Sequence, residues 1–463
     1  MPCKSFEVDV EPGVLIWARE SMGIEIAEVA KRFGLSQNII KKWEYGQKKP
    51  TIIQIKKLAK FYKRPLAVFF LPSPPEEPPL PNDFRTLPDE SRKPFSPETR
   101  LIIRKARRLQ SLAIELAEGT NKDIHTNVGR VNLSDNPEIV ANNERIHVGI
   151  DIQTQFSWSR EVDAFEEWKK AVEKLGILVF QFPLAVEEIR GFSLPKDILP
   201  AIVLNRRDHV RARIFSLFHE YGHLLLDTDG ICNWEILNGS FKTDGSVEKF
   251  CNHFAGAFLV PKDALQNHKL VRLQRNTSEW SDKDLEKVAK DFNVSREVIL
   301  RRLVTFRLVE WDFYRIKYEK WKKIAKKEHE PKHLFDIEIR YKQYLEKGPI
   351  NEILVNVFSD NNLALTKDAK IVQRIDNEWK IKDGNKIYLI KDSGIHLKIF
   401  KEKVGGGKQN IPKKCILENS IPFTSLVFDS YRKEKITYND VADFLGIRAK
   451  YIPKVERFIG AKA

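Results

Sequence analysis

Residues 214–226 read IFSLFHEYGHLLL and contain the motif HExxH. Each residue of a helix turns by about 100°, so His219 and His223 fall on one face with Glu220 beside them. Two imidazoles at this spacing can hold one metal ion, and the carboxylate can act on water held by that ion. Apolar residues recur at helical spacing opposite the motif: Ile214, Leu217, Phe218, Tyr221, Leu224 and Leu225. We therefore expect a zinc-hydrolase helix with one face on the core and the other toward a cleft.

A third metal ligand is expected, because catalytic zinc takes three protein ligands and leaves a fourth position open. Glu248 lies near the start of a second helical segment, residues 246–255. Asn252 is on the same face, where it could orient a zinc-bound imidazole through its free N–H. Two alternatives stay open: Glu248 could be a first-turn acid that favours the helix dipole, and Asp227 and Asp229 are weaker candidates for the third ligand.

The composition favours a cytoplasmic protein of about three domains. The chain has 463 residues, a net charge of +15 and a pI near 9.4, which favours a polyanionic partner. No apolar run is long enough to cross a membrane, and the N-terminus lacks the pattern of a signal peptide. The four cysteines show no CxxC spacing, so we expect reduced thiols rather than disulfides or a metal site.

Residues 11–72 have the pattern of a small helical bundle. Gly34 ends an amphipathic segment, and Ser36 can cap a second short helix that continues to Tyr45. Two short helices joined by a turn with glycine form the helix-turn-helix geometry. Amide side chains can bond adenine edges and lysines can contact phosphates. The second helix carries such a set on its polar side: Gln37, Asn38, Lys41 and Lys42.

This N-terminal segment resembles the Cro/C1-type (XRE) helix-turn-helix family. The resemblance rests on Ala30, Gly34, Ser36, the run WEYG at 43–46 and the pair KP at 49–50. It implies an N-terminal domain that binds operator DNA. One position departs from the family, which usually has Gln for a phosphate contact where this chain has Ile26. A protein-binding use of the same fold therefore stays open.

The central part of the chain resembles the ImmA/IrrE family of zinc metallopeptidases. Its members carry HExGH, matched at 219–223, and a later pattern E-x-x-x-N-x-F-A, matched at 248–255. Many begin with a Cro/C1-type domain and a proline-rich joint that ends in Asp-Phe-Arg, matched at 83–85. The resemblance implies that Glu248 is the third zinc ligand. It also implies a peptidase that inactivates a repressor protein, often one encoded nearby.

The expected fold class is multidomain α+β, with an all-α N-terminal bundle and an α+β zincin-like domain built around the HExxH helix. We expect helices at 101–118 and 162–175 and buried strands at 177–182 and 201–205. The predicted domains are a helix-turn-helix domain (1–71), a proline-rich linker (72–98), a metallopeptidase domain (99–310) and a mixed C-terminal region of unknown role (311–463) that ends in a helical segment. Alternating residues at 350–404 predict a small β-rich insert in that last region, after a lysine-rich helix at 311–333.

A loose internal repeat occurs at residues 28–36, 287–295 and 440–448. Each copy has an amphipathic helix, a turn and the start of a new helix, with a small alanine that allows close packing. We expect the later two copies to be packing modules, because such bihelical turns are a common way to dock helices. The alternative, that they are further DNA-reading units, stays open.

These features together predict a DNA-binding regulator with a zinc-dependent endopeptidase domain. His219, His223 and Glu248 would hold Zn²⁺, which would polarise the scissile carbonyl and lower the pKa of bound water. Glu220 would take a proton from that water and pass it to the leaving amine. The residue that would donate to the tetrahedral oxyanion is left open among His253, Tyr221 and His209.

The predicted protein partner is a repressor encoded nearby, and the regulator could itself form a homodimer. A competing hypothesis is a regulator or antitoxin that binds DNA or a protein without cleaving a peptide bond. The intact HExxH motif counts against this hypothesis, because structural zinc rarely needs the intervening glutamate.

Overall fold

The computed structural model describes residues 6–77, 95–120, 126–184, 189–226, 246–274, 280–329, 335–338, 370–375, 378–383, 386–392, 396–402 and 410–460. The chain separates into two units, one formed by Met1–Val309 with Ile411–Ala463 and the other by Glu310–Asn410. Helical bundles and two small sheets confirm the expected multidomain α+β class. The predicted joint at 83–85 and the alternative ligands Asp227 and Asp229 lie outside the described residues.

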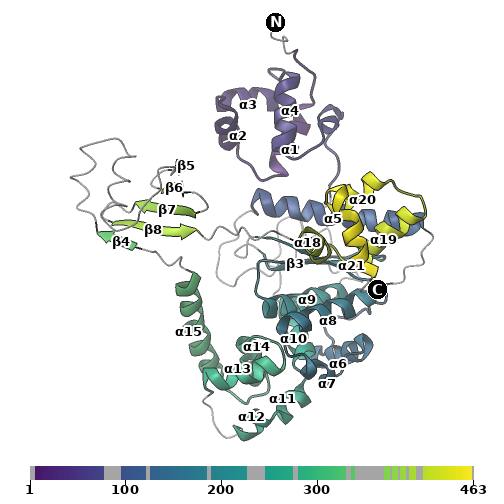
Figure 1. Ribbon diagram of the computed structural model, residues 1–463, viewed down its shortest axis with the longest axis vertical. Helices are drawn as coiled ribbons and strands as arrows, with labels where there is room; N and C mark the ends of the chain where they lie inside the picture. The colour runs from purple at the N-terminus through teal and green to yellow at the C-terminus, as the bar shows by residue number, and fades with distance from the viewer. Residues whose placement is uncertain are drawn as a thin grey trace. The chain divides into compact units, whose positions relative to one another are not determined.

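The N-terminal bundle contains four α-helices and a short 3-10 helix (Figure 1): α1 (Pro12–Glu20), α2 (Ile26–Phe33), α3 (Gln37–Glu44), α4 (Ile52–Phe61) and η1 (Leu66–Phe70). Gly34 ends α2 with a φ of 63°, a left-handed conformation that glycine adopts without strain. The turn directs the chain into α3, which packs beside α2. The helices enclose one apolar core, and its buried members include Val14, Val29, Ile40 and Trp43.

A three-stranded sheet lies at the centre of the first unit. Its strands are β1 (Leu178–Phe182), β2 (Gly191–Leu194) and β3 (Ala201–Asn205), in the order β1-β3-β2. β1 runs parallel to β3, and β2 runs antiparallel to it. Every residue of the three strands is buried, because helices cover both faces. Burial on both faces explains why β1 and β3 read as continuous apolar runs in the sequence.

On one face of the sheet, α8 (Glu161–Lys174) and α9 (Val210–Leu226) pack against the strands, and α10 (Ser246–Leu259) packs against α9. Two further helices, α6 (Pro137–Val148) and α7 (Ile152–Ser157), precede α8 in the chain, and α6 contacts α10. The chain then continues through α11 (Lys262–Asn267), α12 (Lys269–Leu273), α13 (Asp282–Asp291) and α14 (Arg296–Thr305). This layer contains the HExxH helix.

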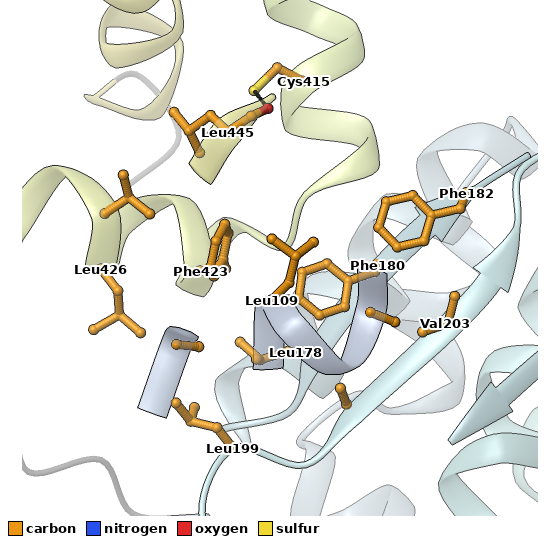
Figure 2. Packing of buried hydrophobic residues seen from close by; sticks show 14 of the residues in the cluster. Leu109, Leu178, Phe180, Phe182, Leu199, Val203, Cys415, Phe423, Leu426 and Leu445 are labelled. Atoms are coloured by element: carbon orange, nitrogen blue, oxygen red, sulfur yellow. Dashed lines mark hydrogen bonds between the residues drawn. The ribbon is translucent and has the colours of Figure 1, made fainter. Parts of the chain in front are cut away.

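The other face of the sheet is covered by α5 (Pro97–Gly119) together with the C-terminal helices α18 (Ile411–Glu418), α19 (Ile421–Arg432), α20 (Tyr438–Leu445), η4 (Ala449–Tyr451) and α21 (Ile452–Gly460). Figure 2 shows Phe180 of β1 and Leu109 of α5 in one apolar cluster with Phe423 and Leu426 of α19.

The single C-terminal region expected at 311–463 is therefore divided in the structure. Its last helices complete the core of the first unit, since α18 and α19 both pack on β1. Only residues 310–410 form the second unit. Burial of the apolar faces of α18 and α19 against the sheet stabilises this arrangement.

The second unit begins with α15 (Trp311–His329) and contains a five-stranded antiparallel sheet in the order β4-β8-β7-β6-β5. The strands are β4 (Phe335–Glu338), β5 (Lys370–Ile375), β6 (Glu378–Asp383), β7 (Lys386–Asp392) and β8 (His396–Glu402). This sheet is the β-rich insert that the sequence predicts. Among the described residues, no helix has the length and apolar character needed to cross a bilayer.

Candidate metal centre and helix-turn-helix

The α9 helix carries the HExxH motif in the interior of the protein. The side chains of His219 and Glu220 are 0% exposed and that of His223 is 2% exposed. The sequence predicts that one side of this helix faces a cleft, and that stays a prediction, although the helix itself is deeply buried. Every residue from Ile214 to Leu226 is buried, because α8, α10 and the strands β2 and β3 pack around the helix.

Gly222, the fourth residue of the motif, allows α10 to approach α9 closely. A Cβ atom added at Gly222 would lie 3.1 Å from the Phe254 ring, 3.3 Å from Cys251 Sγ and 3.4 Å from Cys251 Cα. A larger residue would therefore push the two helices apart. Because Glu248 stands at the start of α10, this close approach brings its carboxylate to the histidines of α9.

Three candidate ligands meet where α9 and α10 cross. The Nε2 atoms of His219 and His223 are 3.1 Å apart. The Glu248 carboxylate lies 3.4 Å from His219 Nε2 and 3.3 Å from His223 Nε2. The side chain of Glu248 is 38% exposed, so among the described residues the group is accessible from the side of this carboxylate.

The spacing of these donor atoms fits a tetrahedral metal ion. An ion with bonds of about 2.0–2.1 Å to its ligands separates neighbouring ligand atoms by roughly 3.3 Å. The separation of 3.1 Å between the two histidine nitrogens is close to that value, and so are the 3.3 and 3.4 Å separations from these nitrogens to the two different oxygens of Glu248. Two imidazoles and one carboxylate are also the donor set of catalytic zinc in several hydrolases. The three residues therefore form a candidate metal site with a position left for water or substrate.

The charges around the three candidate ligands keep Glu248 ionised, which is the form that binds a metal ion. Burial alone would raise the pKa of this carboxyl group, but hydrogen bonds with His219 and His223 outweigh it and hold the pKa far below its usual range. A carboxylate that stays ionised at neutral pH is ready to bind a cation. Burial lowers the pKa of His223, while Cys251 and Glu248 raise it, and the net shift is upward.

Cys251 is a contact that sequence reasoning missed. Its thiol is fully buried, and it forms a side-chain hydrogen bond with His223. The thiol is therefore a further partner of this imidazole, beside the two candidate ligands near its Nε2 atom. The sequence assigns an orienting role to the next residue, Asn252. Asn252 is half-buried on α10, and within the described chain it makes no hydrogen bond to either histidine, so its role stays a prediction.

Glu220, the candidate base, lies against the edge strand β2. A Cβ atom added at Gly191 would be 3.4 Å from both Cγ and Oε1 of Glu220, and 3.0 Å from the backbone oxygen of Val203. The absence of a side chain at Gly191 therefore leaves room for the carboxylate. The sequence does not predict β2, since a four-residue strand that begins with glycine has no clear strand pattern.

Two of the three residues considered as oxyanion donors have other partners. Tyr221 OH donates to the Glu144 carboxylate, which belongs to α6. His253 Nε2 lies 2.6 Å from Glu138 Oε1, also on α6. Both side chains thus connect their own helix to α6. The third, His209, is 68% exposed and lies 3.7 Å from Glu161.

In the N-terminal bundle, α3 presents its polar side to solvent. The predicted DNA-contacting residues are all exposed there: Gln37, Asn38, Lys41 and Lys42. On the opposite side, Ile40 and Trp43 are buried. Glu44 forms a salt bridge with Arg19 of α1, with Nε and Oε1 2.7 Å apart. Contacts on its inner side thus hold α3 to the bundle, and its outer side is exposed to solvent.

Two known domain families match the chain. Residues 172–304 match the peptidase family described as the IrrE N-terminal-like domain, and residues 15–69 match a helix-turn-helix family. The first match contains β1–β3, α9 and α10 with all three candidate ligands, and the second contains α2, α3 and α4. The resemblance to ImmA/IrrE peptidases with an XRE-type domain is therefore confirmed. The helix-turn-helix match supports DNA binding, and the other match supports a peptidase-like domain.

No curated protein matches this chain. Among solved structures, a Mycobacterium tuberculosis transcriptional regulator is similar at 14% sequence identity with a TM-score of 0.26. The alignment covers 42% of this chain, which spans about half (51%) of that solved chain. A TM-score this low does not establish a shared overall fold.

Proposed function

We propose that this protein is a DNA-binding transcriptional regulator whose second domain is a zinc-dependent endopeptidase that cleaves a partner regulator. The observation that carries the proposal is the meeting of two imidazole nitrogens and one carboxylate within 3.4 Å of one another. Glu220, a buried carboxylate, follows the first of these histidines directly. This combination of residues suits the hydrolysis of a peptide bond better than a purely structural metal site.

His219, His223 and Glu248 would hold the zinc ion. Bound there, zinc would supply a Lewis acid for the scissile carbonyl and would make water more acidic. Glu220 would act as the general base, accepting a proton from the attacking water and delivering it to the leaving amine. Its position inside the protein excludes bulk solvent, which strengthens electrostatic interactions. Asn252 is proposed to orient one of the two histidines.

The edge strand β2 offers a place for an extended peptide. In the described sheet β2 pairs only with β3, so its other edge is the proposed place for a further strand. Peptides commonly bind such an edge by adding a strand to the sheet. Because Gly191 of β2 lies against Glu220, a peptide on this edge would pass close to the base. The proposed substrate of the peptidase is therefore an extended segment of the partner protein.

The N-terminal domain would bring the peptidase to its target on DNA. Gln37 and Asn38 would contact base edges, and Lys41 and Lys42 would contact phosphates of the operator. The exposure of all four side chains on one helix supports this assignment. The proposed partner is a repressor encoded near this gene, since a peptidase that removes a repressor needs to meet it at the DNA that both control.

The proposal is tested by incubating the neighbouring regulator with zinc-loaded full-length protein or with the Glu220→Gln variant. The products are measured by intact mass spectrometry. A discrete cut made by the wild-type protein alone would support a site-specific endopeptidase and would identify its substrate. Cleavage by both proteins would refute the role of Glu220.

An uncut partner that still binds the protein would favour the second hypothesis, a regulator that binds without cleaving. A pull-down between the two purified proteins, made in parallel with the cleavage reaction, separates these outcomes. The Glu220→Gln variant is also suited to capture the substrate, since it keeps all three candidate metal ligands.

A further inference from the structure

The same turn joins two helices at three places in the first unit. It lies between α2 and α3, between α13 and α14, and between α20 and η4–α21. The turn residue has a left-handed backbone in each copy, with φ of 63° at Gly34, 55° at Asn293 and 64° at Gly446. The loose repeat in the sequence therefore corresponds to a repeated backbone geometry.

One hydrogen bond closes each turn in the same way. The residue after the turn donates its backbone N–H to the alanine five positions earlier. The N···O distances are 3.0, 2.9 and 3.0 Å for the pairs Leu35–Ala30, Val294–Ala289 and Ile447–Ala442. The three turns thus share one closing hydrogen bond and one left-handed residue.

The C-terminal copy repeats more of the N-terminal bundle than the turn alone. Helix α2 spans 26–33 and α20 spans 438–445, a constant shift of 412 positions, and the same shift relates the last residues of α1 and α19, 20 and 432. An ion pair joins the first and third helices in both copies, although its arginine is shifted by one position, since Tyr431 and not Arg432 corresponds to Arg19. Arg19 at the end of α1 pairs with Glu44 at 2.7 Å, and Arg432 at the end of α19 pairs with Glu456 at 2.9 Å.

Glu456 lies 412 positions after Glu44, at the corresponding place on the third helix. Helices α19, α20 and η4–α21 thus repeat the order and the sequence register of α1, α2 and α3. The middle copy is different, because Leu303 of α14 stands where the glutamate would be.

The burial of the second helix distinguishes the middle copy from the other two. In α14, the side chain of Leu300 is 0% exposed at the position that corresponds to the exposed Lys41 of α3, which is the pattern of the expected packing module. In α21, Ile452 and Val455 are buried while Lys454 and Arg457 are exposed. This is the same division into an inner and an outer side that α3 shows.

The outer side of the C-terminal copy is basic. Arg448, Lys450, Lys454 and Arg457 are all exposed, and none of them forms a salt bridge with another described residue. The one acid on α21, Glu456, is held by Arg432. Cations at 450, 454 and 457 lie along one helical face, which is the arrangement that phosphate groups of a duplex attract.

We propose that α20, η4 and α21 form a second DNA-binding helix-turn-helix, in which Arg448, Lys450, Lys454 and Arg457 contact backbone phosphates of duplex DNA. This unit is separate from α3, to which the proposed function assigns operator binding. A protein with two such units would hold two segments of DNA, or one site at two places. The copy at α13–α14 stays a packing module.

The test measures binding of the full-length protein to a fluorescein-labelled duplex of random sequence, by anisotropy over a series of salt concentrations. The variant Lys454→Ala/Arg457→Ala removes two proposed phosphate contacts. Its matched control, Lys283→Ala/Lys290→Ala, removes two exposed cations from α13 and so has the same net charge. Losing two phosphate contacts should lower the magnitude of the slope of log K against log salt by about 1.8, and the control should leave it unchanged.

Equal effects of the two variants would overturn the proposal, because net charge and not the place of the cations would then decide binding. Wild-type protein that fails to bind any duplex, or that prefers single-stranded RNA, would overturn it as well. Repeating the titration in a Lys41→Ala/Lys42→Ala background separates the two units. DNA binding that remains there and is lost on adding Lys454→Ala/Arg457→Ala would establish the C-terminal unit independently of α3.

Discussion

Helices α9 and α3 both carry the polar residues of a proposed site, but these residues are buried on α9 and exposed on α3. On α9, His219, Glu220 and His223 are buried, with no more than 2% of any side chain exposed. On α3, Gln37 and Lys41, like their polar neighbours, are exposed. Burying polar groups costs several kcal/mol unless they find partners, whereas exposed polar groups cost almost nothing. The cost of burying the polar residues of α9 therefore implies that they are kept for a chemical role, whereas the exposed residues of α3 carry no such cost.

Substitutions on the two helices should therefore have different kinds of effect. On α9 they should change metal binding, catalysis or folding by large amounts. On α3 they should leave the fold intact and change only the affinity for a partner.

The largest effect is expected from His219→Ala, which removes one of three candidate ligands. Zinc bound per protein molecule should fall from about one to nearly zero, because two remaining ligands hold the ion poorly. A ligand at 100 times its Kd stabilises the folded state by about 2.7 kcal/mol, so a chelator should lower the Tm of the wild type and leave that of the variant unchanged. Metal analysis and thermal unfolding measure both.

The matched control is His253→Ala, since this histidine lies on α10, the helix that carries Glu248, but pairs with Glu138. It should keep the full amount of zinc. Unchanged zinc content in His219→Ala would contradict the ligand assignment.

The next effect is that of Glu220→Gln on the rate. The amide has the shape of the carboxylate but cannot accept the proton, so kcat for the partner protein should fall by about 10²- to 10⁴-fold. Zinc content and Tm should stay close to wild type. Single-turnover cleavage followed by mass spectrometry measures the rate, and a fall of less than tenfold would mean that another group accepts the proton.

A smaller loss is expected from Gly191→Ala, which adds a Cβ atom 3.0 Å from the Val203 carbonyl oxygen and 3.4 Å from Glu220 Oε1. Either the strand or the carboxylate must move, and a displacement near 1 Å can reduce a rate by up to about 100-fold. The control is Gly119→Ala, where an added Cβ meets nothing within 4 Å. An unchanged kcat in a folded Gly191→Ala protein would show that the base does not depend on β2.

Tyr221→Phe tests whether every polar group on α9 serves catalysis. The hydroxyl donates to Glu144, away from the candidate ligands, and losing a hydrogen bond to a charged acceptor should lower the free energy of unfolding by about 2 kcal/mol. Zinc content and kcat should not change. Urea denaturation measures the stability. A loss of cleavage without a loss of stability would instead identify Tyr221 as a donor to the oxyanion.

The same contrast explains how much the sequence predicts. The HExxH spacing follows from helical period within a few residues, the resemblance to ImmA/IrrE peptidases adds Glu248, and the structure brings His219, His223 and Glu248 together. The partners of Tyr221 and His253 lie 77 and 115 positions away on α6, and no local pattern indicates them. A partner on another helix becomes apparent only when the helices pack.

Features of the fold that depend on packing between distant segments are likewise not predicted from the sequence. Helices α18 and α19 complete the layer on β1 although more than two hundred residues separate them from it. The patterns recognised in this part of the sequence, a β-rich insert at 350–404 and a repeat copy at 440–448, predict neither of these helices nor the sheet that buries them. The four-residue β2 is found for the same reason only in the structure, because its pairing with β3 and its contact with α9 define it.

The smallest effect on stability, and the sharpest test of the contrast, is expected from Lys41→Ala/Lys42→Ala on α3. Both side chains are exposed, so the free energy of unfolding should change by less than about 0.5 kcal/mol. If these lysines contact operator phosphates, the salt dependence of DNA binding should weaken by about 1.8 in slope. Lys56→Ala/Lys57→Ala on α4 is the control, with the same charge and the same domain. DNA binding that responds equally to both variants would mean that the outer face of α3 serves a protein partner instead.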